Sequence, residues 1–552
     1  MSYSPLQTER YNYKPKLPEV LKGNIHKIGI NPKGSTRSET NQNELAEMFP
    51  RTYGAPFIET LGIEEALESK NVNIGVVLSG GQAPGGHNVI SGLYDAMIKA
   101  NPESKLIGFL GGPSGILENK TLEMNSKIID QFRNTGGFDI IGSGRTKLET
   151  TEQFDICEDV CKLLDISCLV IIGGDDSNTN GAVLAEYFKQ KDSGISVIGV
   201  PKTIDGDLKN EYIEVSFGFD TATKTYSELI GNIEKDANSA KKYWHFIKLM
   251  GRSASHICLE CALQTHPNIA LISEEIEHNH KSLTEIVLDM VNIIVKRSEL
   301  GSNYGIVLIP EGLIEFIPEM KQLISELNTL LAEHAEHFST LHTFEDQSRW
   351  INRELSRDSS YVFSTLPNNI QRQLLMDRDP HGNVQVSRIE TEKLLIQMIA
   401  SRLDEMKSEG KYKGSFSPQD HFFGYEGRCA FPSNFDADYC YSLGYNAYIL
   451  AASELTGYIS SIHNLAKPVM EWTAGAVPVT MMMTLEQRHG KLKPVIKKAM
   501  VDLEGKPFNE FVSKRDIWAI KSSYMFPGAI QYFGPHEVCD ISSITLQLEC
   551  NK

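Results

Sequence analysis

Short apolar runs rich in β-branched residues recur through the middle of the chain, and stretches with helical spacing separate most of them. A short apolar run bounded by glycine or proline is typical of a buried strand. The runs lie at 72–78, 105–110, 168–172, 195–200, 246–250, 268–272 and 304–309. Strands that alternate with helices form βαβ units and a mostly parallel sheet. The pattern therefore predicts an α/β fold.

The pattern changes on either side of these strands. Residues 317–407 are rich in Leu, Glu, Lys, Gln and Met at helical spacing, which predicts an inserted, largely helical subdomain. A further strand is predicted near 422–425, followed by a helix around 438–462. Prolines and a polar Ser/Thr/Asn stretch favour an arm or loop, rather than a core layer, for residues 1–70.

These changes predict how the chain divides into domains. The predicted parts are an N-terminal extension over 1–70, a first α/β domain over 71–240, a second α/β domain over 241–315 and 411–470, a helical insertion over 316–410, and a mixed C-terminal region over 471–552 that packs on the core. Each α/β domain is expected to be Rossmann-like, with its own parallel sheet.

Charge and cysteine use exclude several classes of protein. The chain has 54 Lys and Arg against 71 Asp and Glu, a formal net charge of −17, so it is not expected to bind nucleic acid or an anionic membrane surface. No apolar run is long enough to span a bilayer, and the polar start does not resemble a secretory signal. Nine scattered cysteines predict reduced thiols and a cytoplasmic location. Cys258 and Cys261 have no second cysteine pair, which argues against zinc.

Two acidic turns each follow one of the apolar runs. They are Gly173-Gly174-Asp175-Asp176-Ser177 and Pro201-Lys202-Thr203-Ile204-Asp205-Gly206-Asp207. Ligands bind at the strand ends of parallel α/β sheets, and carboxylates there can hold a hard cation or take a proton. One aspartate of the first turn could instead cap a helix beginning near Asn178. Four carboxylates and one lysine in two such turns favour metal-assisted phosphoryl transfer.

Several other loops carry residues that suit phosphate binding. They are the glycine-rich loop 79–88, the loop 142–147 with Arg145 and Lys147, the turn Met250-Gly251-Arg252, Glu311, and the turn Tyr425-Glu426-Gly427-Arg428. Glycine lets backbone N–H groups approach an anion, and arginine can hold a phosphate with two nitrogens. Taken singly, each loop could be a tight turn, a solvated surface loop or, for Glu311, a solvated acid. Those alternatives leave unexplained why such residues follow most strands of the α/β part.

Five motifs carry a family resemblance. GGQAPGGHN at 80–88, GGDDSN at 173–178, PKTIDGD at 201–207, MGR at 250–252 and GYEGR at 424–428 resemble the phosphofructokinase family in order and spacing. The chain is most similar to the long pyrophosphate-dependent class, which includes the plant catalytic β-subunit and microbial relatives. The likeness covers about 60–470. It implies the phosphofructokinase fold and a reversible, glycolytic transfer of phosphoryl from pyrophosphate to the 1-hydroxyl of fructose 6-phosphate, with Mg²⁺ as cofactor. It also implies a homodimer that shares its active site across the interface.

The resemblance assigns roles residue by residue. Asp205 matches the general base for the hydroxyl, Thr203 a sugar phosphate contact, Asp175 the magnesium-holding aspartate, and Gly81 a donor contact. The residues that match the fructose 6-phosphate pocket are Met250, Gly251, Arg252, Glu311, Tyr425 and Arg428, with Lys242 and Tyr243 reaching from the dimer partner and Arg145 and Lys147 in a phosphate-facing loop. ATP-using members place an arginine in the region of Lys242.

Asp176 and Lys202 bear on the choice of donor. ATP-using relatives have glycine at both positions. A carboxylate at Asp176 would lie near a nucleotide's α-phosphate, where like charges repel by on the order of several kcal/mol in a partly dehydrated pocket. The Lys202 ammonium can neutralise a departing phosphate, so pyrophosphate is the expected donor.

Three other functions fit the sequence less well. A non-catalytic regulatory subunit of a hetero-oligomer would be expected to lack part of the Asp and Lys set that this chain has complete. A lipid- or NAD-kinase-like enzyme shares the GGD turn but would not be expected to carry the MGR and GYEGR motifs. A dinucleotide dehydrogenase is not expected, because no GxGxxG follows the first strand.

Overall fold

The chain forms two compact units in a computed structural model that describes residues 3–376, 384–488 and 491–550. Unit 1 comprises Met1–Thr225, Tyr425–Ala499 and Ile530–Lys552, and unit 2 comprises Tyr226–Gly424 and Met500–Ala529. Helix α8, Phe219–Ala240, begins in unit 1 and continues into unit 2. In the described part of the chain, no helix combines the length and the apolar character needed to cross a membrane.

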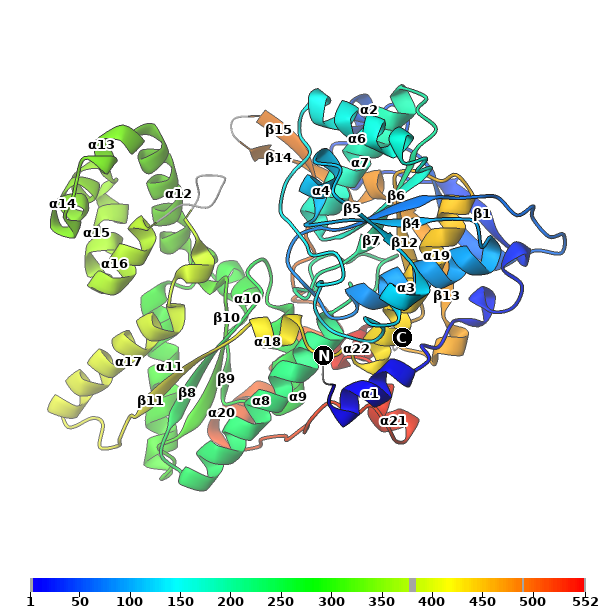
Figure 1. Ribbon diagram of the computed structural model, residues 1–552. Helices are drawn as coiled ribbons and strands as arrows, with labels where there is room; N and C mark the ends of the chain where they lie inside the picture. The colour runs from blue at the N-terminus through cyan, green and yellow to red at the C-terminus, as the bar shows by residue number, and fades with distance from the viewer. Residues whose placement is uncertain (1–2, 377–383, 489–490, 551–552) are drawn as a thin grey trace. The chain divides into compact units, whose positions relative to one another are not determined.

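A nine-stranded sheet forms the centre of unit 1, in the order β1-β2-β13-β12-β7-β6-β3-β4-β5 (Figure 1). Its strands are β1 Ile28–Ser35, β2 Pro56–Gly62, β3 Ile74–Leu78, β4 Leu106–Phe109, β5 Thr121–Met124, β6 Cys168–Gly173, β7 Ser196–Pro201, β12 Tyr458–His463 and β13 Thr473–Pro478. The strands from β12 to β4 run parallel, and antiparallel strands flank them on both sides. β3, β6 and β7 are buried along their whole length, which explains their continuous apolar sequence.

Unit 1 also contains helices and a two-stranded hairpin. The helices are α1 Pro5–Asn12, α2 Gln42–Met48, α3 Gly86–Ala100, α4 Pro113–Leu117, α5 Ser126–Ile129, α6 Thr151–Leu163, α7 Asp175–Gln190, α18 Tyr425–Arg428, α19 Asn434–Ala452, α21 His536–Cys539 and α22 Ile544–Cys550; the hairpin strands are β14 Met483–Arg488 and β15 Lys491–Ile496. α7 packs against β6 and β7. α19 packs against β7 and β12, and α3 packs against α19.

Unit 2 contains a four-stranded parallel sheet in the order β11-β8-β10-β9. The strands are β8 Trp244–Leu249, β9 Ile269–Ala270, β10 Gly305–Pro310 and β11 Pro418–Phe423, and the helices outside the predicted insertion are α9 His256–Thr265, α10 Ser273–His278, α11 Leu283–Glu299 and α20 Lys506–Ile520. The insertion forms α12 Pro318–Glu333, α13 Ala335–Ser339, α14 Phe344–Glu354, α15 Arg357–Thr365, α16 Asn368–Leu375 and α17 Thr391–Ser408. One apolar cluster joins these helices to β8, β10 and α11, so the insertion shares the core of unit 2.

The structure confirms the strands predicted between 72 and 309, and it corrects three other expectations. The strand predicted near 422–425 is β11, which ends at Phe423. Residues 1–70 are not only an arm or loop, because β1 and β2 join the main sheet. Pro32 made this stretch resemble a loop in sequence. Proline is nevertheless tolerated in a strand at the edge of a sheet, and β1 lies at that edge. The predicted helix 438–462 is also wrong beyond Ala452, where Glu454 and Gly457 adopt left-handed conformations and the chain enters β12.

Candidate active site

Three of the predicted loops meet at the carboxyl edge of the unit 1 sheet. β7, β6 and β3 are neighbours in the sheet, and the loops that follow them are 201–207, 173–177 and 79–88. Ser177 Oγ lies 2.8 Å from Ser79 Oγ, and the Lys202 N–H donates to the Gly173 carbonyl at 3.0 Å. These contacts hold the loops together at the edge where parallel α/β sheets bind their ligands.

The first acidic turn is the beginning of a helix. α7 begins at Asp175, its N-cap is Gly174, and no side chain caps it. The alternative in which an aspartate caps a helix near Asn178 is therefore wrong. Asp175 and Asp176 both lie in the first turn, where the partial positive charge of the helix end favours anions. Asn178 is buried and donates to the carbonyls of Gly173 and Gly174, which fixes the turn that presents the two carboxylates.

The second acidic turn surrounds a buried lysine. Lys202 Nζ would lie 3.4 Å from a Cβ at Gly80, so it lies against the glycine-rich loop. The pKa of Lys202 is lowered to about 8, chiefly by burial and with help from the nearby cations Arg428 and Arg145, while Asp205 and Asp175 oppose the shift. The Lys202 charge therefore lies among groups from both acidic turns and from two basic segments.

Asp205 and Asp207 occupy different surroundings in the second turn. Thr203 Oγ1 accepts a hydrogen bond from the Asp205 N–H at 3.0 Å, and Asp205 remains half-buried. Asp207 is buried, and its burial together with the charges of Asp205 and Asp175 raises the pKa of Asp207 to about 7. The three carboxyl groups are therefore close enough to influence one another.

Predicted phosphate-binding cations also lie in unit 1. Lys147 Nζ is 3.4 Å from Asp176 Oδ1, and Arg145 is exposed two residues earlier. A Cβ at Gly81 would lie only 2.6 Å from Arg428 Nη2, so the absence of a side chain at Gly81 leaves room for that guanidinium. Tyr425, three residues before Arg428 in α18, is 69% exposed. Gly81 and Arg428, predicted for the donor and the sugar respectively, are thus neighbours.

Lys498 is a residue that the sequence reasoning missed. Its Nζ lies 3.6 Å from Asp175 Oδ2, and its charge also acts on Asp207. It follows β15, in the C-terminal region to which the sequence pattern assigned no chemistry. Two adjacent lysines after a strand are too common to have identified it.

Four more predicted residues lie at the carboxyl ends of two neighbouring strands of unit 2. Met250, Gly251 and Arg252 follow β8, and Glu311 follows β10. Gly251 has φ +126°, and its N–H donates to Glu311 Oε2 at 2.9 Å. Because Glu311 is buried, its interpretation as a solvated acid is wrong. Arg252 is exposed in a loop that precedes α9.

Lys242 and Tyr243 lie just before β8 in unit 2. Lys242 is exposed, and its Nζ is 5.1 Å from the centre of the Tyr243 ring. The Tyr243 carbonyl accepts a hydrogen bond from the Gly305 N–H at 3.1 Å, which anchors the backbone of this turn to the start of β10. The turn therefore presents a cation and an aromatic ring from a fixed backbone.

The carboxylates of unit 1 fit a magnesium ion that a phosphate ligand helps to hold. Asp175, Asp205 and Asp207 offer the hard oxygen atoms that magnesium prefers, and their mutual repulsion would be relieved by a cation. Among the described residues, no three His, Cys, Asp or Glu side chains could enclose a metal ion by themselves. Magnesium typically takes one or two carboxylates and completes its shell with substrate phosphates and water, so this partial cage suits it.

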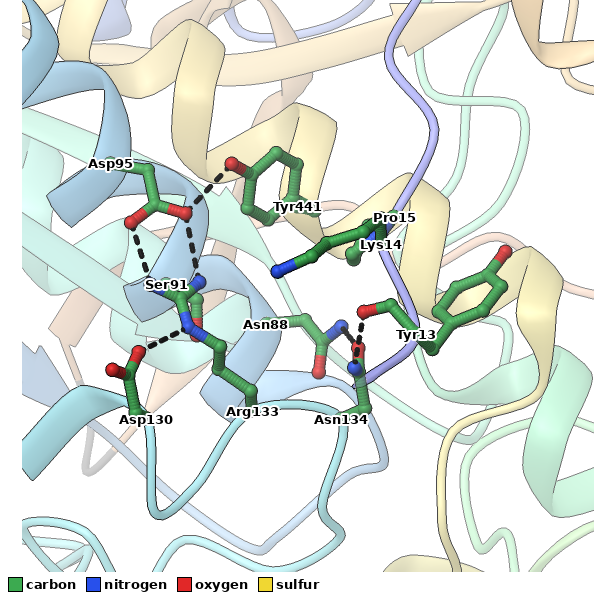
Figure 2. Close-up of a pocket in the computed structure, with 10 residues that line it drawn as sticks. All are labelled: Tyr13, Lys14, Pro15, Asn88, Ser91, Asp95, Asp130, Arg133, Asn134 and Tyr441. Carbon is green, nitrogen blue, oxygen red and sulfur yellow. Dashed lines mark hydrogen bonds and ion pairs between the residues drawn. The ribbon is translucent and has the colours of Figure 1, made fainter. Parts of the chain in front are cut away.

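A cavity of about 220 Å³ elsewhere in unit 1 contains none of the predicted site residues (Figure 2). The cavity is lined by Tyr13, Lys14, Pro15, Asn88, Ser91, Asp95, Asp130, Arg133, Asn134 and Tyr441. Arg133 contacts carboxylate oxygens of Asp95 and of Asp130 at 2.7 Å. Two carboxylates therefore neutralise its guanidinium, which leaves it poorly suited to bind a phosphate.

The chain is similar to known proteins in sequence and in fold. A family model described as Phosphofructokinase matches residues 73–347. A Porphyromonas gingivalis protein named pyrophosphate--fructose 6-phosphate 1-phosphotransferase is 56% identical over 551 residues, 100% of each chain. The Arabidopsis thaliana protein named as subunit beta 1 of that enzyme is 53% identical over 99% of this chain and 94% of its own. The crystal structure of a pyrophosphate-dependent phosphofructokinase from Marinobacter aquaeolei covers 82% of this chain and 93% of its own at TM-score 0.52 and 15% identity, a likeness of fold alone. The chain therefore belongs to the phosphofructokinase family.

Proposed function

We propose that this chain transfers a phosphoryl group reversibly from pyrophosphate to the 1-hydroxyl of fructose 6-phosphate, in the cytoplasm. The surroundings of Lys202 carry the proposal. This buried ammonium is influenced by Asp205, by Asp175 and by the cations Arg428 and Arg145. A base for a hydroxyl, a ligand for a metal ion and cations for phosphate are the parts that phosphoryl transfer requires, and here they surround one lysine.

Each residue of the two acidic turns has its own role in this proposal. Asp205 accepts the proton of the sugar hydroxyl as that oxygen attacks phosphorus, and Thr203 orients the turn through its bond to the Asp205 N–H. Asp175 would hold a magnesium ion, whose charge would offset the negative charge of the phosphoryl group in transfer. Lys202 stays close to the departing phosphate and neutralises it.

The choice of donor rests on Asp176 together with Lys202. Asp176 projects from the first turn of α7 and is exposed, and Lys147 provides a cation 3.4 Å from it. A nucleotide would have to place its α-phosphate close to this carboxylate, whereas pyrophosphate ends before that point. The repulsion between the Asp176 carboxylate and the α-phosphate therefore excludes ATP.

Fructose 6-phosphate is assigned to the residues of unit 2 that follow β8 and β10, and the family resemblance gives Tyr425 and Arg428 of unit 1 a role with the same substrate. The buried Glu311 holds the backbone of the Met250-Gly251-Arg252 turn and is suited to accept hydrogen bonds from sugar hydroxyls. Lys242 and Tyr243 are assigned to the sugar phosphate of a partner subunit, which makes a homodimer part of the proposal. Analytical ultracentrifugation tests that part, and a monomer with full activity would contradict it.

The experiment that tests the function is an initial-rate assay of the purified chain with fructose 6-phosphate, magnesium and either pyrophosphate or ATP at matched concentrations. We expect turnover with pyrophosphate in the forward direction and with phosphate and fructose 1,6-bisphosphate in reverse. A clear preference for ATP would overturn the choice of donor. A folded chain with no turnover would favour the regulatory-subunit alternative.

A further inference from the structure

Lys498 reaches the acidic turns from a segment far along the chain. It lies two residues beyond the end of β15, the second strand of the C-terminal hairpin, which packs against α7 (Figure 1). Its Nζ is 3.6 Å from Asp175 Oδ2, and about one third of its side chain, 34%, is exposed. The hairpin therefore delivers an ammonium group to the carboxylate that is assigned to the metal ion.

The backbone on both sides of Lys498 is fixed to the same elements that form the site. The Ile496 N–H donates to Thr179 Oγ1 of α7 at 3.1 Å, and the Ala499 N–H donates to the Asp207 carbonyl at 2.8 Å. Ile496 is itself buried in the apolar cluster that contains Leu208. The position of the Lys498 Cα is thus set by α7 and by the second acidic turn, and only the side chain is left to move.

The charged groups at the carboxyl edge of the unit 1 sheet indicate a role for the Lys498 ammonium. The four carboxylates of Asp175, Asp176, Asp205 and Asp207 are accompanied by five cations, namely Arg145, Lys147, Lys202, Arg428 and Lys498. With Lys498 the cations outnumber the carboxylates by one. That excess would add to the charge of a divalent ion at Asp175 and favour a ligand with several negative charges, in a chain whose net charge is −17.

We propose that Lys498 is a pyrophosphate-binding residue, held by Asp175 in the free protein and transferred to a donor oxygen when substrate binds. The inference rests on the proposed function and names a contact within its donor site. If Asp175 held a divalent ion, its ammonium partner would need another anion, and the phosphate groups of the donor would supply one at the same place. The long lysine stem permits this movement without a change in the backbone.

An ion pair that serves only stability would behave differently. The Lys498 side chain is partly exposed, and such pairs contribute little to folding. Lys497 provides the matched control, because it is the adjacent lysine, pairs with Glu39 at 2.7 Å and points its charge at a surface carboxylate instead of the acidic turns. Removing either charge should leave the melting temperature within about 2 °C of the wild type.

The test compares the full chain with Lys498→Met, Lys498→Arg and Lys497→Met. We expect Lys498→Met to raise the KM for pyrophosphate about tenfold or more, the loss expected for a hydrogen bond to a charged group, and to change the KM for fructose 6-phosphate less than about twofold. Lys498→Arg should recover part of the affinity, and Lys497→Met should match the wild type.

A second measurement separates substrate binding from a structural role. In the absence of pyrophosphate, Mn²⁺ binding followed by electron paramagnetic resonance should become tighter in Lys498→Met, because the ammonium no longer competes for Asp175. Calorimetric pyrophosphate binding should become weaker in the same variant. Equal loss of affinity for both ligands, an unchanged pyrophosphate affinity, or the same defect in Lys497→Met would overturn the inference. If the wild type turns over pyrophosphate and Lys498→Met equals it, only this inference fails; if the wild type neither binds nor turns over pyrophosphate, the proposed function fails with it.

Discussion

Asp205 and Asp207 lie in the same turn but differ in burial, and this difference suits them to different roles. Asp205 is half-buried, and no cation among the described residues donates a hydrogen bond to its carboxylate. Asp207 is buried, and burial together with its acidic neighbours raises its pKa to about 7. A base must reach its substrate, which the partly open position of Asp205 allows. Asp207 instead fixes the backbone beside Lys498 through its carbonyl.

Asp205→Asn is expected to lower kcat by roughly 10²- to 10⁴-fold, the usual cost of losing a general base. Asparagine preserves the size of the side chain and leaves the backbone N–H bond to Thr203 in place. The KM for pyrophosphate should change little, because Asp205 acts on the acceptor hydroxyl. Steady-state kinetics alongside a thermal unfolding curve would check this, and a kcat near that of the wild type in a folded variant would remove Asp205 from the mechanism.

At the scale of elements, the close contact between α3 and α19 keeps the glycine-rich loop in place. α3 begins where that loop ends, and Gly92 on α3 and Gly444 on α19 let the two helix backbones approach each other. A Cβ at Gly92 would lie 2.1 Å from the Tyr441 carbonyl oxygen, and a Cβ at Gly444 would lie 1.9 Å from that of Val89. Backbone atoms cannot yield to such overlaps unless a helix moves.

Gly92→Ala should therefore destabilise the fold by about 2 kcal/mol or more, although alanine in a helix would otherwise be favourable. Gly181→Ala on α7 is the matched control. The nearest atom to a Cβ there is Ile171 Cδ1 at 3.1 Å, the end of a flexible side chain, so its effect should stay within about 1 kcal/mol. Urea unfolding would measure both, and equal stabilities for the two variants would contradict the packing argument.

The elements also explain what the sequence could and could not predict. The runs that became β3, β6 and β7 are apolar along their length because both faces of those strands are covered, so the pattern predicted them and the loops at their ends. β1 contains Pro32 and polar residues because it lies at the sheet edge, and it resembles a loop in sequence. Lys498 could not be found at all, since only tertiary contacts of the hairpin bring it to Asp175.

Across the whole molecule, several acidic side chains are buried, in both units, and burial raises their pKa values. Burial raises the pKa of Asp436 and of Asp438 in unit 1 to about 7, with the charge of Asp220 adding to the shift at Asp436. In unit 2, burial raises the pKa of Glu234 on α8 to about 10. A folded pKa above the unfolded one means that the folded chain holds a proton that the unfolded chain has released. Each group therefore stabilises the fold most below its unfolded pKa, and that contribution is lost as pH rises through the folded value.

Glu234 allows this linkage to be measured for a single group. Its side chain is fully buried, and glutamine has the shape of its protonated form, so Glu234→Gln should match the wild type in stability near pH 5. Between about pH 6 and pH 9 the wild type should lose stability relative to the variant by about 1.4 kcal/mol per pH unit, the slope for one proton. Groups such as Lys202, whose pKa shift runs the other way, are common to both chains and cancel in the difference. Asp236→Asn, at an exposed position of the same helix, controls for the loss of a carboxylate. Urea unfolding across this pH range gives the difference directly, and a gap between wild type and Glu234→Gln that does not change with pH would show that Glu234 is not held in its protonated form.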